Sequence, residues 1–232
     1  MYVLWKPGDM ASEQFRDNFL QQVVASLQQA GASQLRFTVI DNAVTPAARL
    51  FIRHTQPSPD AIASFWLDSA IHRQALEQIL RSCCSACHGY LVTESEALRN
   101  QQHMAPKGQR THGMNQVVFL RRPSRLDFQT WIDLWHNSHT QIALETQSTF
   151  GYRQNVVTRT LTAGAMPIDA IVEENFPPEA MDSAHAFYKA IAADGKKDHE
   201  LMKQHQTKMY QSVQRFLDFD QLDCLPMSEY NF

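Results

Sequence analysis

The sequence predicts an α+β protein built from two tandem β-α-β-β-α-β units. Strand-like and helix-like segments follow one another in this order twice along the 232 residues. A short apolar strand followed by a basic residue and a proline opens both halves, as Val3-Leu4-Trp5-Lys6-Pro7 and as Phe119-Leu120-Arg121-Arg122-Pro123. We interpret the halves as a diverged internal repeat, with an N-terminal unit at residues 1–98, a linker at 99–113 and a C-terminal unit at 114–232.

The first unit contains both helical and strand periodicities. An apolar residue recurs every four positions after a capping Ser12, which predicts a helix that ends before Gly31. Apolar and polar residues alternate over residues 35–40, which predicts a strand. The other expected elements are strands at residues 2–5, 48–54 and 89–93 and a helix over residues 62–80.

The second unit repeats the pattern and adds one helix. Strands are expected at residues 115–120, 152–158, 168–172 and 222–227, and helices at 124–145 and 177–191. Pro177-Pro178 begin the second of these helices, because proline suits the first helical turn. A further helical stretch at residues 197–216 precedes the last strand.

The helix beginning at Ser124 carries the most chemically suggestive residues of the chain. Ser124 and Asp127 have the spacing of a capping box, with aspartate in place of glutamate. Spacings of three and four then place one set of side chains on a single helix face: Phe128, Trp131, Ile132, Trp135 and His139. Aromatic residues at this spacing usually fill the layer between helices and a sheet, so the tryptophans are expected in the core.

Composition and charge argue against several classes of protein. The formal net charge of −3 and the absence of a basic stripe argue against nucleic-acid binding. No apolar run is long enough to cross a bilayer, and residues 1–7 lack the layout of a secretory signal. Four cysteines without a framework spacing fit a reducing compartment. We therefore expect a soluble, cytoplasmic protein.

An antiparallel sheet formed by one such unit has helices on one face, while its other face needs a partner. This is the ferredoxin-like arrangement, and two such sheets packed face to face close a barrel. A tandem repeat supplies both sheets. We therefore expect a dimeric α+β barrel that forms as a pseudo-dimer within one chain.

The C-terminal unit resembles the EthD-domain family. The resemblance rests on residues 114–123, on Phe128, Trp135 and His139, and on the segments Tyr152-Arg153-Gln154-Asn155-Val156-Val157 and Ile168-Asp169-Ala170-Ile171-Val172-Glu173. It implies a dimeric α+β barrel, whose relatives include cofactor-free cyclases, dehydratases, monooxygenases and lactone isomerases, and also haem-handling proteins. The extra stretch at residues 197–216 departs from the family pattern and could roof the barrel mouth or mediate assembly.

His139 is the first candidate for catalysis. An imidazole in an apolar cavity can take a proton from an activated carbon or give one to a leaving hydroxyl. Asp169 or Glu173 could orient the ring from a nearby strand. The alternative is a histidine at the edge of the core that bonds to the backbone.

Donors for a developing oxyanion are expected on the strand at residues 152–158. Arg153 and Asn155 point to one face of that strand and Tyr152 to the other, so they cannot all line one cavity. Trp135, Arg153 and Tyr152 are the candidates for ligand binding, and Asn155 is a candidate for catalysis beside Asp169.

Two other patterns are associated with metal or haem chemistry. His136 and His139 lie three residues apart, but two ligands do not make a metal site, and none is expected. Cys84-Ser85-Ala86-Cys87-His88 matches the C-x-x-C-H pattern of haem c attachment, which needs an exported chain. We favour the interpretation that this cluster, with Cys83, consists of small buried residues at a helix end.

Three functions remain open. The first is an enzyme that acts on a small hydrophobic or carbonyl-containing metabolite by proton transfer without a cofactor, with His139 as acid or base. Its reaction would be a cyclisation, dehydration or isomerisation, and a cofactor-independent oxygenase is a further class. The second is a module that binds a small ligand or haem without catalysis. The third is a structural protein that forms a homodimer and whose cavity is filled by side chains.

Overall fold

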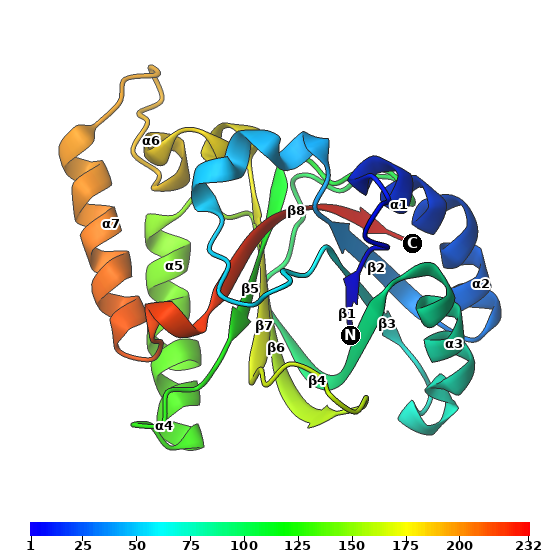
Figure 1. Ribbon diagram of the computed structural model, residues 1–232. Coiled ribbons are helices and arrows are strands. Elements are labelled where there is room, and N and C mark those ends of the chain that lie inside the picture. The colour runs from blue at the N-terminus through cyan, green and yellow to red at the C-terminus, as the bar shows by residue number, and fades with distance from the viewer.

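The computed structural model describes all 232 residues, and its centre is a closed barrel of eight strands (Figure 1). The order around the barrel is β1-β3-β2-β8-β5-β7-β6-β4, and β4 pairs back to β1. The strands are β1 (Tyr2–Trp5), β2 (Ser33–Val39), β3 (Ala61–Trp66), β4 (Ala86–Leu98), β5 (Met114–Leu120), β6 (Gly151–Thr160), β7 (Ala170–Phe176) and β8 (Asp223–Asn231). Every neighbouring pair is antiparallel.

Most of the helices cover the outside of the barrel in two groups, one from each half of the chain (Figure 1). The first half contributes α1 (Ser12–Asn18), η1 (Phe19–Val23), α2 (Val24–Gln29), η2 (Asn42–Leu50), η3 (Ala70–Arg73) and α3 (Gln74–Cys83). The second half contributes α4 (Phe128–Ile132), η4 (Asp133–His139), α5 (Thr140–Thr146), η5 (Pro178–Met181), α6 (Ala184–Phe187), α7 (His199–Gln214) and η6 (Phe219–Gln221).

The two halves use their strands in the same way. Each half has the strand order fourth, first, third, second, as β4-β1-β3-β2 and as β8-β5-β7-β6. The second strand of each half pairs with the fourth strand of the other, so β2 pairs with β8 and β6 with β4. Two ferredoxin-like repeats therefore close one dimeric α+β barrel within a single chain, which confirms the expected fold class.

Both halves also widen their first helix by a π-helical turn. η1 connects α1 to α2, and η4 connects α4 to α5 without a break. A π-helical turn holds an extra residue and often occurs at a functional site. In the second half this turn carries Trp135 and His139. The residue spacing of a regular α-helix does not predict either π-helical turn.

The sheet divides its side chains between two regions. On the outer face, residues such as Phe37 and Tyr152 pack beneath the helices, and Phe37 stacks on Phe19 with ring centroids 3.8 Å apart. Inside the barrel lies an apolar cluster that includes Val3, Ile62, Val117, Phe119, Ile171 and Leu225. Charged and amide side chains occupy another part of the barrel interior.

The prediction was wrong for the middle of the first half. Residues 48–54 were expected as a strand, but η2 occupies part of this stretch and Ile52 makes only an isolated bridge to Cys224. The third strand is instead β3, at the start of the expected helix over 62–80. Its first four residues are all buried, so they lack the alternation between apolar and polar positions that would distinguish a strand from a buried helix. Pro46 lies within η2, where its fixed φ suits a tight helical turn.

Two helix boundaries in the second half also differ from expectation. Asp127, not Ser124, is the N-cap, because its side chain accepts from the Thr130 backbone N–H at 2.8 Å. The helix therefore begins at Phe128, whose side chain is exposed rather than part of the buried face. The helix expected at residues 177–191 consists of the short η5 and α6, while the expected helix at 197–216 is present as α7.

None of the helices combines the length and apolar character that crossing a membrane requires.

Candidate functional site

A cavity of about 420 Å³ lies between the outer face of the C-terminal sheet and the helices that cover it. Its walls come from β5, β7 and β8, from η4 and α7, and from residues 49–52 of the first half. Of its 24 lining residues 18 are hydrophobic, so an apolar ligand body is favoured. α7 thus covers this cavity, on the outside of the sheet, and does not roof the barrel mouth (Figure 1).

His139 reaches this cavity from the π-helical turn η4 and is 7% exposed. Its Nδ1 lies 2.9 Å from the hydroxyl of Ser212 on α7, and its ring lies 4.8 Å from that of Phe216. Its Nε2 has no hydrogen-bond partner in the chain and is not enclosed by other atoms, so it is open to the cavity. Burial lowers the pKa of His139 to about 4, which leaves the imidazole neutral at pH 7.

Glu174 lines the same cavity from β7 and is 7% exposed. In the strand register it lies between Gln116 on β5 and Tyr152 on β6. No hydrogen bond or ion pair within the chain compensates its burial, which raises the pKa of Glu174 to about 8. The carboxyl group is therefore protonated at pH 7 and can donate a hydrogen bond.

Trp135 and Tyr152, both expected to bind ligand, do lie beside His139 in the cavity wall. The indole Nε1 of Trp135 donates to the Tyr152 hydroxyl at 3.1 Å, which holds both rings in place. Burial raises the pKa of Tyr152, so its phenol stays protonated. Gln147 adds a further polar group to the cavity wall, because its buried Oε1 has no hydrogen-bond partner.

Arg153 and Asn155 lie on the opposite face of β6, inside the barrel. Arg153 Nη1 donates to Glu229 Oε2 at 2.9 Å, and Asn155 Nδ2 donates to Glu173 Oε2 at 3.1 Å. Strand alternation predicted that they would be separated from Tyr152, and the structure places them away from the cavity. The two residues therefore do not join His139 at one site.

Glu173 also belongs to the barrel interior and does not orient His139. Its carboxylate accepts from Arg36 Nε at 3.0 Å and Nη2 at 2.8 Å, and Arg36 Nη2 also donates to Glu94 at 2.9 Å. Burial by itself would raise the pKa of Glu229 in this network, but Arg153 and Arg36 lower it to about 2. These carboxylates are paired with arginines, so the network is a structural one.

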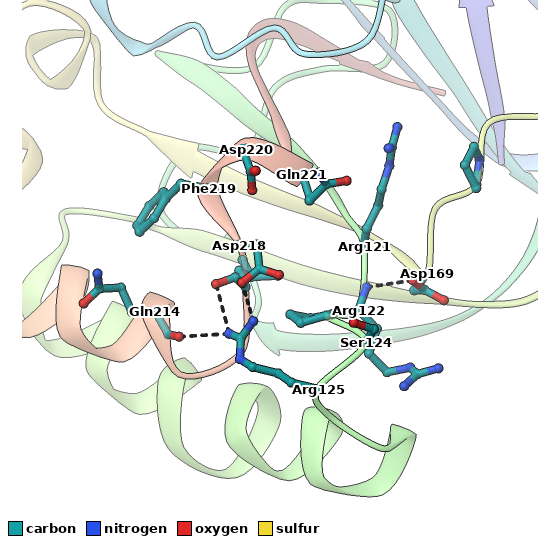
Figure 2. Close-up of a pocket in the computed structure, with 13 residues that line it drawn as sticks. Arg121, Arg122, Ser124, Arg125, Asp169, Gln214, Asp218, Phe219, Asp220 and Gln221 are labelled. Atoms are coloured by element: carbon teal, nitrogen blue, oxygen red, sulfur yellow. Dashed lines mark hydrogen bonds and ion pairs between the residues drawn. The ribbon is translucent and has the colours of Figure 1, made fainter.

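Asp169 does not line this cavity but lies in a separate open groove on the surface. Figure 2 shows this groove. Its Oδ2 accepts from the Arg122 backbone N–H at 2.7 Å and so holds the turn after β5. Arg125 in the same groove pairs with Asp218 and donates to the Gln214 carbonyl at 3.1 Å. The groove has a volume of about 1040 Å³, but it is open and several of its charges are paired within the chain. The structure therefore does not place Asp169 in the cavity that His139 lines.

The cysteine cluster occupies the corner between α3 and β4. The thiols of Cys83 and Cys84 both donate to the Leu80 carbonyl, at 3.1 and 2.8 Å. His88 packs on Trp5 with ring centroids 4.5 Å apart, and its Nδ1 accepts from the Met166 N–H at 3.3 Å. No three or more histidine, cysteine or acidic side chains are grouped so that they could hold a metal ion.

Two residues of the site, Glu174 and Ser212, were missed in the sequence. Glu173-Glu174, directly after the apolar residues Ala170-Ile171-Val172, was the available signal, because alternation directs the two carboxyls to opposite faces. Ser212 carried no signal, since a serine on a helix is ordinary unless the packing brings a partner to it.

The chain is similar to known proteins in structure but not in sequence. No family model matches the chain, and no curated protein matches it in sequence. An anthrone oxidase-like protein shares 8% sequence identity at a TM-score of 0.47, over 100% of this chain and 89% of that one. A chlorite dismutase-like protein shares 12% identity at a TM-score of 0.44, over 100% of this chain and 91% of that one. Neither similarity assigns an activity, and the barrel is established by the strand pairing described above.

Proposed function

We propose that this protein binds a small hydrophobic, carbonyl-containing metabolite in the cavity and moves a proton on it without an organic cofactor. One observation carries the proposal: the free Nε2 of His139 and the unpartnered carboxyl of Glu174 open onto one apolar cavity. The EthD-like pattern of the C-terminal half is consistent with it. That the chain belongs to the EthD-domain family is likewise a proposal.

The two groups suit complementary roles. When Nδ1–H donates to Ser212, Nε2 of His139 presents its lone pair to the cavity. It would take a proton from the carbon beside the carbonyl, and the electron pair would move to the carbonyl oxygen. The protonated Glu174 would donate a hydrogen bond to that oxygen as its negative charge develops. Return of the proton to another carbon gives isomerisation, and its transfer to a departing hydroxyl gives dehydration.

This proposal assigns no role to Asp169, Asn155 or Arg153, because they bond elsewhere in the structure. Glu174 takes the assisting role that the sequence predicts for Asp169 or Asn155. Trp135 and Tyr152 are proposed to contact the apolar body of the ligand from the cavity wall.

The test uses 2-tetralone, a two-ring ketone with acidic hydrogens beside its carbonyl. In D₂O at pH 7, NMR measures the rate at which these hydrogens exchange with and without the protein. We expect acceleration by the wild type and a loss of about 10²-fold or more in His139→Gln, the range typical of a removed general base. Asp169→Asn is the matched control and should keep the wild-type rate. Equal rates in His139→Gln and wild type would exclude His139 as the base.

A haem-binding module is the second candidate, and the same free Nε2 in an apolar cavity favours it. Titration with hemin distinguishes the two candidates. A Soret shift that saturates at one equivalent and disappears in His139→Ala would favour haem, whereas no shift in the wild type would remove this candidate.

A further inference from the structure

Arg49, from the first half of the chain, lines the cavity of the second half and is exposed, so its positive charge lies at the mouth of the cavity. It lies near the C-terminal end of η2, the blue-to-cyan helical segment that Figure 1 shows beside α6. Two features fix its place. Ala47 is fully buried, and Ile52 exchanges two backbone hydrogen bonds of 2.9 Å with Cys224 on β8.

The guanidinium of Arg49 has no carboxylate partner in the chain. Its single hydrogen bond runs from Nη2 to the Ala180 carbonyl and is long, at 3.4 Å. Tyr188 also lines the cavity, and its hydroxyl makes no hydrogen bond. Arg49 and Tyr188 line the same cavity, so one ligand group could meet both side chains.

The rest of the cavity carries no net charge at pH 7. Its other titratable groups include His139, which is neutral, and Glu174, which is protonated. A charged ligand group deep in this apolar space would lose its hydration without compensation. At the mouth, the same group would remain partly hydrated and meet a planar guanidinium that matches an oxyanion with two N–H donors.

We infer that Arg49 and the Tyr188 hydroxyl bind an oxyanionic group, a carboxylate or a phosphate monoester, on a ligand whose apolar body fills the cavity. The ligand would thus be an amphipathic acid, held with its anion at the mouth and its carbonyl toward Glu174. This inference rests on the proposed function, since it concerns the same cavity. It adds a determinant of specificity from the N-terminal half, outside the EthD-like unit.

The test measures the binding of three naphthalene probes to the full-length protein by fluorescence titration. The probes are 2-naphthoate, 2-naphthyl phosphate and the uncharged methyl 2-naphthoate. We expect at least one anion to bind about tenfold or more tightly than the ester, the size of one charged hydrogen-bonded contact. Arg49→Gln should remove this preference while leaving the affinity for the ester unchanged. The anion that binds more tightly identifies the natural anionic group as carboxylate or phosphate.

Arg53→Gln is the matched control, because Arg53 lies over the ring of Phe51 at 3.9 Å and does not line the cavity. It should keep the preference for the anion. If wild type binds anion and ester equally, or if Arg49→Gln keeps the preference, the inference fails while the cavity remains a ligand site. If none of the probes binds to wild type, both the inference and the proposed function fail.

Discussion

At the scale of single residues, Glu173 and Glu174 illustrate how one step along a strand changes the chemistry of a side chain. Glu173 points into the barrel and is bound by Arg36, whereas Glu174 points outward into an apolar cavity with no partner. The first is a paired ion and the second a neutral acid at pH 7. Identical side chains thus become a structural link and a candidate acid through strand alternation alone.

Glu174→Gln should change how stability depends on pH. The folded pKa of Glu174, about 8, lies above the usual value of 4.5, so its favourable contribution is complete below pH 4.5 and is lost as pH rises through 8. The variant should not lose stability in this way, because the glutamine side chain does not ionise. Its free energy of unfolding should exceed that of wild type by about 3 kcal/mol at pH 9, which is less than the full pKa shift would give because the cavity is partly open to solvent.

Urea denaturation at pH 5 and pH 9 measures this difference. The exposed Glu179→Gln is the control and should follow the wild-type dependence on pH. If Glu174→Gln and wild type lose stability in parallel between the two values, Glu174 is already ionised at neutral pH, and its role as an acid is lost.

At the scale of elements, the site depends on the contact between two helices. The π-helical turn η4 presents His139, and α7 presents Ser212 as its partner. The salt bridge between Lys208 and Glu145 joins α7 at the surface to α5, which continues η4 without a break. α7 therefore serves both as a wall of the cavity and as the support that orients the imidazole.

Ser212→Ala should impair His139 without removing it. The loss of one buried hydrogen bond should lower the free energy of unfolding by about 1 kcal/mol. The exchange of 2-tetralone should slow by about tenfold, because the ring is no longer held with Nε2 toward the cavity. NMR titration of the imidazole gives a second readout, since a change in its partner alters its pKa and tautomer.

Ser138→Ala is the control. Ser138 lies on the same π-helical turn as His139, but its hydroxyl bonds to Arg215 instead. Unchanged exchange in Ser212→Ala would show that Ser212 does not position the base.

At the scale of the whole molecule, the barrel interior links the two halves of the chain. Arg36 belongs to the first half, and it pairs with Glu173 of the second half and Glu94 of the first. Arg153 and Glu229, both from the second half, extend the network across the barrel. Since Arg36, Glu173 and Glu229 are buried, each needs its partner more than an exposed ion would.

Arg36→Met should destabilise the barrel strongly. It leaves Glu173 buried without its cation, and breaking a buried pair in this way costs about 3–5 kcal/mol. The double variant Arg36→Met/Glu173→Leu should recover part of this loss, because it removes the stranded charge as well. Chemical denaturation measures both effects.

Arg81→Met is the control, since Arg81 is exposed and its pair with Glu77 should contribute less than about 1 kcal/mol. A loss in Arg36→Met no larger than in Arg81→Met would mean that the network does not hold the halves together.

The sequence by itself determined the features that depend on neighbouring residues. The repeated order of strands and helices predicted the two-unit barrel, and alternation along β6 separated Arg153 and Asn155 from Tyr152. These patterns are local, because a strand has a period of two and a helix a period near 3.6. They are therefore readable without any knowledge of distant contacts.

Only the tertiary structure decided which distant groups meet. It placed Tyr152 with His139, left Glu174 without a partner, and brought Arg49 from the first half to the mouth of the cavity. It also converted residues 48–54 from an expected strand into a helical turn and an isolated bridge. Such outcomes depend on strand register and on how α7 packs over the sheet. Both are set by the free energy of the whole fold, and no single stretch of residues encodes them.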